Sequence, residues 1–224
     1  MESFDRTAVI ICDGQFPKTE YPRYLIRSAD FTICCDGALV KYLRASRSIF
    51  GKERTPDLVI GDMDTLSPAM QKKYSDIIIK EDEQEHNDQT KAVRWAVNNI
   101  EGLSRIYLIG TSGGRLDHTI GNASLLMEYT RMFDLGALGI AIEAVTDEGT
   151  AFAINDTIEF DCGIGRQVSI FSPDNSLKIR SYGLEYPTED VVFDNWWKAT
   201  LNKAVQDTVR LEFNHPSMAL VFLN

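Results

Sequence analysis

Residues 57–64 read Asp57-Leu58-Val59-Ile60-Gly61-Asp62-Met63-Asp64. The short apolar run in this stretch follows Asp57, ends at Gly61 and is followed by Asp62 and Asp64. Similar runs at 8–12, 31–35 and 105–109 also end at a glycine or an Asp-Gly pair, and a further run lies at 75–79. Continuous apolar runs of this length are typical of strands buried on both faces of a parallel sheet. These five runs therefore predict the strands of one such sheet.

Helical periodicity separates these runs. The apolar residues of 88–100 recur on one face of a helix, and Asn87 is a suitable N-cap. Residues 116–132 predict a second helix, with Ile120 among its inward-facing residues. Alternating strands and helices predict an α/β domain with a Rossmann-like, mostly parallel sheet.

The pattern changes after about residue 145, where helical periodicity disappears and turn clusters separate short β-like runs. The predicted strands there are 157–160, 167–171, 177–182, 191–196, 208–213 and 218–223. Closely spaced short strands favour a small antiparallel β-sandwich. We therefore expect an α/β domain at 1–147 and a C-terminal β-sandwich domain at 148–224.

Composition excludes several classes of protein. The 224 residues carry a formal net charge of −10, whereas a nucleic-acid binder needs a basic face. The four cysteines lack the spacing of a zinc site or a disulfide framework. No signal peptide is apparent, and no apolar run approaches the roughly 18 residues of a membrane span, so we expect a cytoplasmic protein without membrane or nucleic-acid partners.

Polar motifs follow the predicted strands, where ligands of open α/β sheets bind. Asp36 follows the second strand, Asp62 and Asp64 follow the third, and the segments 87–91 and 113–118 each open a helix. Any one aspartate here can be a turn former. The pair Asp62 and Asp64, however, repels at close range unless a cation lies between the two carboxylates.

Several carboxylates at one sheet edge predict a Mg²⁺ site, because oxygen ligands suit that ion. The glycine turn Gly113-Gly114, the helix start after it and Arg115 add affinity for an anion beside the metal. Together these features indicate nucleotide-dependent group transfer. The chain has neither a P-loop nor a G-x-G-x-x-G motif.

The motifs CDGA (35–38), GDMDTL (61–66), NDQTKA (87–92) and GGRLDHTIGN (113–122), in this order and spacing, resemble the thiamine pyrophosphokinase family. The resemblance implies an α/β domain followed by a small β-sandwich. It also implies a homodimer with the active site across the subunit interface. The implied reaction transfers pyrophosphate from ATP to the hydroxyl of thiamine, with Mg²⁺, giving thiamine diphosphate and AMP.

Carried over residue by residue, the resemblance makes Asp62, Asp64 and Asp88 the magnesium carboxylates and, together with Arg115, the catalytic residues. The implied ATP and substrate site comprises Asp36, Gln84, Asn87, Lys91, Arg115 and Asp117. Either Asp36 or Asp64 could accept the proton of the thiamine hydroxyl.

The thiamine contacts implied by the resemblance lie near the C-terminus. A Thr-Ser-Asn triplet helps hold thiamine in the family, and this chain has Thr200-Leu201-Asn202, in which leucine replaces the serine. Thr200 and Asn202 are therefore candidate contacts. The family also stacks an aromatic side chain of the partner subunit on thiamine, for which Trp196 and Trp197 are candidates by character alone.

Three other functions compete with this reading. A pyrophosphokinase acting on a pterin or another hydroxymethyl heterocycle could use the same metal and ATP residues. A non-catalytic thiamine or nucleotide sensor could have kept the fold. A phosphatase with a D-x-D-x-T motif is disfavoured, because Thr65 follows Asp64 directly and two strands precede the motif.

Overall fold

The computed structural model describes residues 5–224 and divides the chain into two compact units. The first comprises the chain up to Asn122 together with Leu135–Asp147, and the second comprises Ala123–Asp134 together with Glu148–Asn224. A long helix, α5 (Leu116–Met132), begins in the first unit, and its residues from Ala123 onward belong to the second.

The first unit contains a parallel sheet with the strand order β6-β5-β1-β2-β3-β4. The strands are β1 (Arg6–Ile11), β2 (Phe31–Cys35), β3 (Leu58–Gly61), β4 (Ile78–Lys80), β5 (Leu103–Ile109) and β6 (Ala141–Val145). The strands β1 to β4 lie side by side in chain order, whereas β5 pairs with the other edge of β1. The direction of winding reverses between β1 and β5, where open α/β sheets bind ligands. The predicted Rossmann-like, mostly parallel sheet is confirmed.

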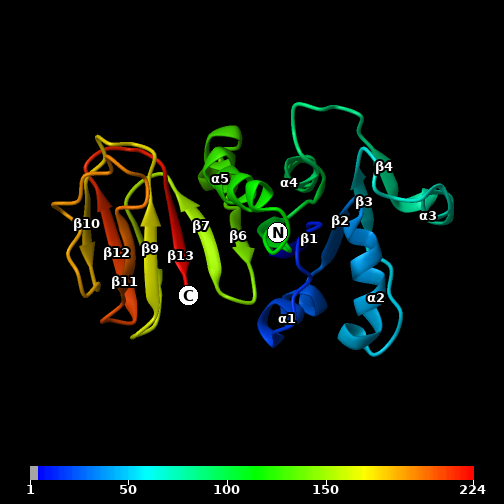
Figure 1. Cartoon of the computed structure of the whole chain (residues 1–224), viewed down its shortest axis with the longest axis horizontal. Coiled ribbons are helices and arrows are strands. Elements are labelled where there is room, and N and C mark those ends of the chain that lie inside the picture. The colour runs from blue at the N-terminus through cyan, green and yellow to red at the C-terminus, as the bar shows by residue number, and fades with distance from the viewer. Residues whose placement is uncertain (1–4) are drawn as a thin grey trace. The chain divides into compact units, whose positions relative to one another are not determined.

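Helices cover both faces of this sheet, and Figure 1 shows α1 and α2 on one side of the strands and α4 on the other. Their bounds are α1 (Glu20–Ser28), α2 (Ala38–Phe50), α3 (Pro68–Lys73), α4 (Asp88–Asn99) and the short α6 (Leu135–Leu138). Val9 and Ile11 pack with α1 and α2 in one buried cluster. Because side chains alternate along a strand, Ala8 and Ile10 face the opposite side, where α4 packs against the sheet.

Two expectations for this unit need correction. The run 75–79 is a strand only in its last residues, because Ser75–Ile77 forms a 3₁₀ turn. β4 pairs with β3 over three residues at the sheet edge, and the polar start of the run is exposed. Ile120 is 50% exposed rather than inward-facing, because burial along α5 begins only near Leu126. The strand β6 was not predicted.

The second unit contains antiparallel strands in two groups, with the orders β11-β9-β13-β7 and β10-β12-β8. The strands are β7 (Thr150–Ile154), β8 (Ile158–Asp161), β9 (Gln167–Phe171), β10 (Ile179–Tyr182), β11 (Ala199–Lys203), β12 (Thr208–Phe213) and β13 (Ala219–Leu223). Val168 and Ile170 from one group meet Val209 and Leu211 from the other in one buried cluster. Alternating residues thus fill the core between two sheets, and the predicted β-sandwich is confirmed.

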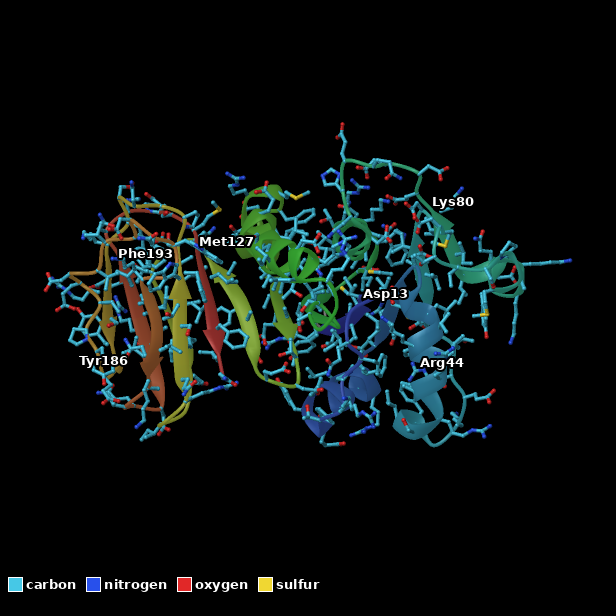
Figure 2. All side chains as sticks on the ribbon, viewed as in Figure 1. Asp13, Arg44, Lys80, Met127, Tyr186 and Phe193 are labelled. Atoms are coloured by element: carbon cyan, nitrogen blue, oxygen red, sulfur yellow. The ribbon has the colours of Figure 1, made fainter. Side chains whose placement is uncertain are left out.

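The segment 191–196, which was expected to be a strand, consists of turns. Its Asp194-Asn195 pair favours a turn, and the N–H of Lys198 donates to the carbonyl of Asn195. Phe193, labelled in Figure 2, anchors the segment in the sandwich core. Trp196 and Trp197 lie in turns, and both side chains are about half exposed.

A turn in the second unit predicts a measurable pH dependence. The Asp174 carboxylate accepts hydrogen bonds from the Ser176 hydroxyl (2.6 Å), the Ser217 hydroxyl (2.7 Å) and the Ser176 N–H (2.8 Å). These bonds lower the pKa of Asp174 to about 2. A depressed pKa stabilises the fold above the unfolded value of about 3.9, and this contribution is lost as the pH falls toward 2.

We therefore expect Asp174→Asn to lower the free energy of unfolding by about 1–2 kcal/mol at pH 7, after allowance for solvent screening of a partly exposed side chain. The deficit should shrink by roughly half at pH 3. Urea titrations at both values test this, with the exposed Asp190→Asn as the control. A deficit that does not change with pH would show that the carboxylate charge is not what stabilises the turn.

Candidate active site

A cavity of about 690 Å³ lies at the carboxyl ends of β1, β2 and β3, beside the segment after β5 and the first turns of α4 and α5. It therefore lies where the parallel sheet changes its direction of winding. The predicted residues that line it are Asp36, Asp62, Asp64, Gln84, Asn87, Asp88, Lys91 and Arg115.

Three carboxylates gather on one side of the cavity. Asp36, Asp62 and Asp64 each offer an oxygen within 4.8 Å of the others. The Asp36 side chain is buried, and its Oδ2 accepts the N–H of Thr65 at 3.1 Å. Its Oδ1 has no hydrogen-bond partner among the described residues. A buried carboxylate oxygen without a partner is costly and points to a bound ion or water. The donor set, three acids with one unsatisfied oxygen, fits Mg²⁺.

Two carboxylates of this cluster, those of Asp62 and Asp64, have pKa values shifted in opposite directions. The Asp62 carboxylate raises the pKa of Asp64, because two like charges oppose each other at short range. Hydrogen bonding from the backbone N–H of Asp64, at 3.2 Å from Asp62 Oδ1, lowers the pKa of Asp62. One carboxylate is thus held ionised while its neighbour gains protons more easily.

The backbone explains why the two acids of the loop after β3 share one side. Met63 is 3% exposed and packs in the core beneath α1 and α2, so Asp62 and Asp64 on either side of it are directed outward. Met63 holds a left-handed conformation with φ 64°, and Asp36 holds one with φ 37°. Such strain in residues other than glycine clusters at functional sites.

Gly61 allows the neighbouring elements to approach. A Cβ atom at this position would lie 2.9 Å from the Asp88 carboxylate and 3.0 Å from Cβ of Asp36. Any other residue would push the start of α4 away from the ends of β2 and β3. The glycine that ends the third strand is therefore required by the site as well as by the turn.

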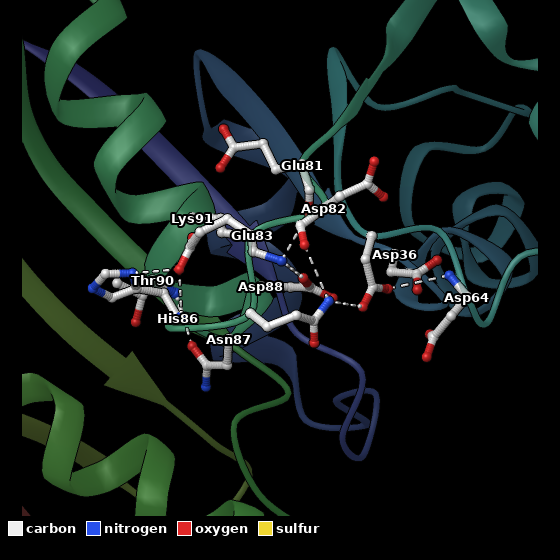
Figure 3. A network of polar contacts seen from close by, with 12 residues as sticks. Asp36, Asp64, Glu81, Asp82, Glu83, His86, Asn87, Asp88, Thr90 and Lys91 are labelled. Carbon is white, nitrogen blue, oxygen red and sulfur yellow. Dashed lines mark hydrogen bonds and ion pairs between the residues drawn. The ribbon is translucent and has the colours of Figure 1, made fainter.

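Asp88 lies beside the three-carboxylate cluster at the first position of α4, and Figure 3 shows Lys91 directed at it. Lys91 is almost fully buried, and its Nζ donates to Asp88 Oδ1 (3.2 Å) and to the Glu81 carbonyl (3.0 Å). Burial raises the pKa of Asp88, and the Lys91 ammonium opposes that rise. Within residues 5–224, Asp88 forms an ion pair with a cation, whereas Asp36, Asp62 and Asp64 form none.

The amide side chains of Gln84 and Asn87 also line the cavity. Gln84 Nε2 donates to Asp62 Oδ2 at 3.3 Å. The Asn87 Oδ1 accepts the N–H of Thr90 at 3.0 Å, so the expected N-cap of α4 is confirmed. The Asn87 amide also reaches Asn122 Oδ1 on α5 at 3.2 Å, which links the starts of the two helices.

Arg115 and Asp117 form an exposed, two-pronged ion pair at the start of α5, with N–O distances of 3.1 and 2.5 Å. Hydrogen bonding to Arg115 lowers the pKa of Asp117. Arg115 lines the cavity, and Asp117 is not among the lining residues. The arginine therefore has a carboxylate partner that an incoming phosphate would have to displace.

The four thiamine-contact candidates, Thr200, Asn202, Trp196 and Trp197, belong to the second unit. Asn202 is buried, and its amide donates to the Tyr186 carbonyl (2.7 Å) and accepts the Tyr186 N–H (3.1 Å), which leaves the amide engaged. Thr200 lies on β11 at an irregularity in its pairing with β9, next to the exposed Leu201 at φ 60°. The Trp196 ring packs against that of Phe171, with centroids 5.2 Å apart.

Sequence reasoning missed the part of the site that follows β1. Asp13, labelled in Figure 2, and Gly14 line the cavity, and Lys41 of α2 holds this turn by an ion pair to Asp13 at 2.7 Å. A Cβ at Gly14 would lie 2.3 Å from the carbonyl oxygens of Gly110 and Ser112. The Asp-Gly pair that ends the first predicted strand was the available signal.

Comparison with known proteins agrees with the motifs. Residues 22–135 match the family described as "Thiamin pyrophosphokinase, catalytic domain", and residues 149–222 match "Thiamin pyrophosphokinase, substrate-binding domain". The chain belongs to the thiamin pyrophosphokinase family. This membership confirms the resemblance that the four motifs indicated.

Individual relatives of this family member are distant in sequence. "Thiamine pyrophosphokinase 1" of Oryza sativa is 24% identical over 72% of this chain and 63% of its own length. The match to a second rice protein, "Thiamine pyrophosphokinase 3", spans half of that protein. "Thiamin pyrophosphokinase 1" of Caenorhabditis elegans is 21% identical over 88% of this chain and 80% of its own length. The chain therefore spans less than two thirds of the two rice relatives.

Solved structures share the fold of this family member. Thiamine pyrophosphokinase from Bacillus subtilis superposes with a TM-score of 0.76 at 17% identity, covering 98% of this chain and 99% of that one. Yeast thiamin pyrophosphokinase gives a TM-score of 0.73 at 18% identity, covering 99% and 87%. Within residues 5–224, no helix is both long and apolar enough to cross a membrane.

Proposed function

We propose that this protein is a thiamine pyrophosphokinase, which transfers the pyrophosphoryl group of ATP to the hydroxyl of thiamine and releases AMP. The observation that carries the proposal is the cavity at the sheet edge, where Asp36, Asp62 and Asp64 converge. In the part of the chain that the structure describes, one buried carboxylate oxygen there lacks a hydrogen-bond partner. Membership of the family supplies the substrate class.

Asp62 and Asp64 would hold Mg²⁺, with Asp36 as the third carboxylate that the geometry favours. Asp88, the other acid implied by the motifs, would contribute from beside them while Lys91 balances its charge. A bound Mg²⁺ would neutralise phosphate oxygens and orient the triphosphate. The relative positions of the acids are set by the protein alone, through Met63 and Gly61.

Transfer of a pyrophosphoryl group needs the acceptor hydroxyl in line with the bond between the β-phosphorus and AMP. Arg115 lines the cavity and is paired with Asp117. With a phosphate in place of Asp117 as its partner, the guanidinium would stabilise the negative charge that develops as that bond breaks. Gln84, Asn87 and Lys91 would position the nucleotide and the acids. Asp36 and Asp64 both line the cavity, and either would be the acceptor of the hydroxyl proton.

The proposal extends to the organisation of the chain. Residues 1–147 would form the catalytic domain that binds ATP and Mg²⁺, and 148–224 the thiamine-binding and dimerisation domain. In the homodimer implied by the motifs, the active site would lie at the subunit interface. Thr200 and Trp196 remain candidate thiamine contacts, whereas the engaged amide of Asn202 favours a supporting role. We also propose a cytoplasmic location.

The test is to incubate the purified protein with ATP, Mg²⁺ and thiamine, and to follow AMP and ADP by chromatography. AMP and thiamine diphosphate should form in equal amounts, and EDTA should stop both. AMP formation only with a hydroxymethylpterin would replace the acceptor and keep the chemistry. Nucleotide binding without consumption would instead support a sensor. Formation of ADP would contradict pyrophosphoryl transfer altogether.

A further inference from the structure

A second cavity in the first unit, of about 810 Å³, lies apart from the candidate active site. Its walls are the C-terminal half of α2, the segment 52–55 and the end of α3 with Tyr74. These segments lead into the amino ends of β3 and β4, whereas the active-site cavity lies at the carboxyl ends. No residue lines both cavities, so we name the second one the α2–α3 pocket.

The floor of the α2–α3 pocket is apolar and aromatic. Leu43, Phe50, Met70 and Tyr74 line it, and all four are half-buried and pack against the core beneath α1 and α2. Two aromatic rings on a rigid floor offer a flat ligand a large contact area at little conformational cost. Volumes of this size are typical of small-molecule sites.

The rim of the pocket is basic, although the chain as a whole carries a net charge of −10. Arg44, which Figure 2 labels on α2, is joined by three further cations, Lys52, Arg54 and Lys73. Throughout the described part of the chain, residues 5–224, none of the four forms an ion pair with a carboxylate. The local field is therefore positive and available to an anion.

Neighbouring groups strengthen this reading. The acid that lines the pocket, Glu53, is already paired with Arg47 at 3.0 Å. The Arg54 guanidinium lies 4.8 Å from the centroid of the Phe50 ring, and Lys73 Nζ lies 5.1 Å from that of Tyr74. Two of the four rim cations thus lie over aromatic rings of the floor, so the pocket combines positive charge with aromatic surface.

We propose that the α2–α3 pocket binds a nucleoside phosphate at a site separate from the active site. The base would rest on the floor formed by Phe50 and Tyr74, and the phosphate would contact the cations of the rim. Arginine and lysine are the usual protein partners of phosphate, and aromatic rings stack on bases irrespective of sequence. This proposal does not rest on the proposed catalytic activity.

AMP binding to the full-length protein, measured by calorimetry in EDTA, tests the proposal without metal in the active site. The test variant is Lys52→Ala/Lys73→Ala, which removes two rim charges. Its matched control is Lys18→Ala/Lys72→Ala, which removes two exposed lysines of the same unit that do not line the pocket. All four lysines are exposed, so both variants should fold, and urea titration verifies this.

We expect the test variant to weaken AMP binding at least about tenfold and the control to change it less than about twofold. AMP should also slow hydrogen exchange over residues 43–55 and 70–74. Equal affinities in the two double variants would overturn the proposal, as would protection confined to the active-site segments. Inorganic phosphate binding as tightly as AMP would overturn the nucleoside assignment, because the aromatic floor would then contribute nothing.

Discussion

Replacing Asp62 with asparagine should reduce pyrophosphoryl transfer to thiamine at least about 10³-fold, which corresponds to roughly 4 kcal/mol of lost transition-state stabilisation. Asparagine keeps the shape of the side chain but removes one of the three converging charges. It also changes the acceptor that fixes the Asp64 backbone and the Gln84 amide. The measurement is the rate of AMP formation with thiamine at saturating Mg²⁺.

Stability separates a catalytic loss from a folding loss in this variant. The hydrogen bonds that lower the pKa of Asp62 stabilise the fold through its charge, whereas its repulsion, which raises the pKa of Asp64, destabilises it. Because the two effects oppose each other, the free energy of unfolding should change little. Calorimetric Mg²⁺ affinity should fall together with turnover. The matched control is Asp82→Asn, an exposed acid that pairs with Lys80 and does not line the cavity. Activity of Asp62→Asn within about tenfold of the wild type would remove Asp62 from the metal site.

Lys91→Met should lower the free energy of unfolding by about 3 kcal/mol, because removing one partner of a buried ion pair leaves the other charge uncompensated. The Lys91 side chain is 2% exposed and that of Asp88 is 27% exposed, which places the expected loss at the lower end of the usual range. Methionine retains the apolar stem, so the loss reports the ammonium group and its two hydrogen bonds. Urea titration at pH 7 measures the change.

The double variant Asp88→Asn/Lys91→Met distinguishes charge from packing. Without the Asp88 charge, most of the lost stability should return, although the Glu81 carbonyl still lacks its donor. Neither variant should transfer pyrophosphate at the wild-type rate, because Lys91 and Asp88 both line the candidate active site. A double variant no more stable than Lys91→Met would indicate that Lys91 acts through packing alone.

The acids after the third strand could be recognised in the sequence because a strand followed by Gly-Asp-x-Asp has few structural outcomes. Parallel strands bring their carboxyl ends to one edge, so Asp36, Asp62 and Asp64 had to lie near each other once the sheet was predicted. The helix start at Asn87 was equally local, because an N-cap bonds its own first turn.

Other features depended on contacts between residues distant in the chain. Spacing cannot show that Lys91 is buried against Asp88 and the Glu81 carbonyl, or that Arg115 is paired with Asp117. The segment 191–196 resembled a strand because its apolar residues match that pattern. In the structure Phe193 is buried in the core and Val191 packs against it, whereas Val192 and Trp196 are about half exposed. The strand predicted at 75–79 is shorter in the structure, because an edge strand pairs with a neighbour on one side only.

By itself, the sequence determined the class of each half, the order of the strand-end motifs and the family, because periodicity and short motifs are local properties of the chain. Only the tertiary structure decided which oxygens converge, which acid has a cationic partner, and that Arg44, Lys52, Arg54 and Lys73 line a pocket with an aromatic floor. The reason is physical: charge interactions depend on distance in space and on burial, and neither is encoded by separation along the chain.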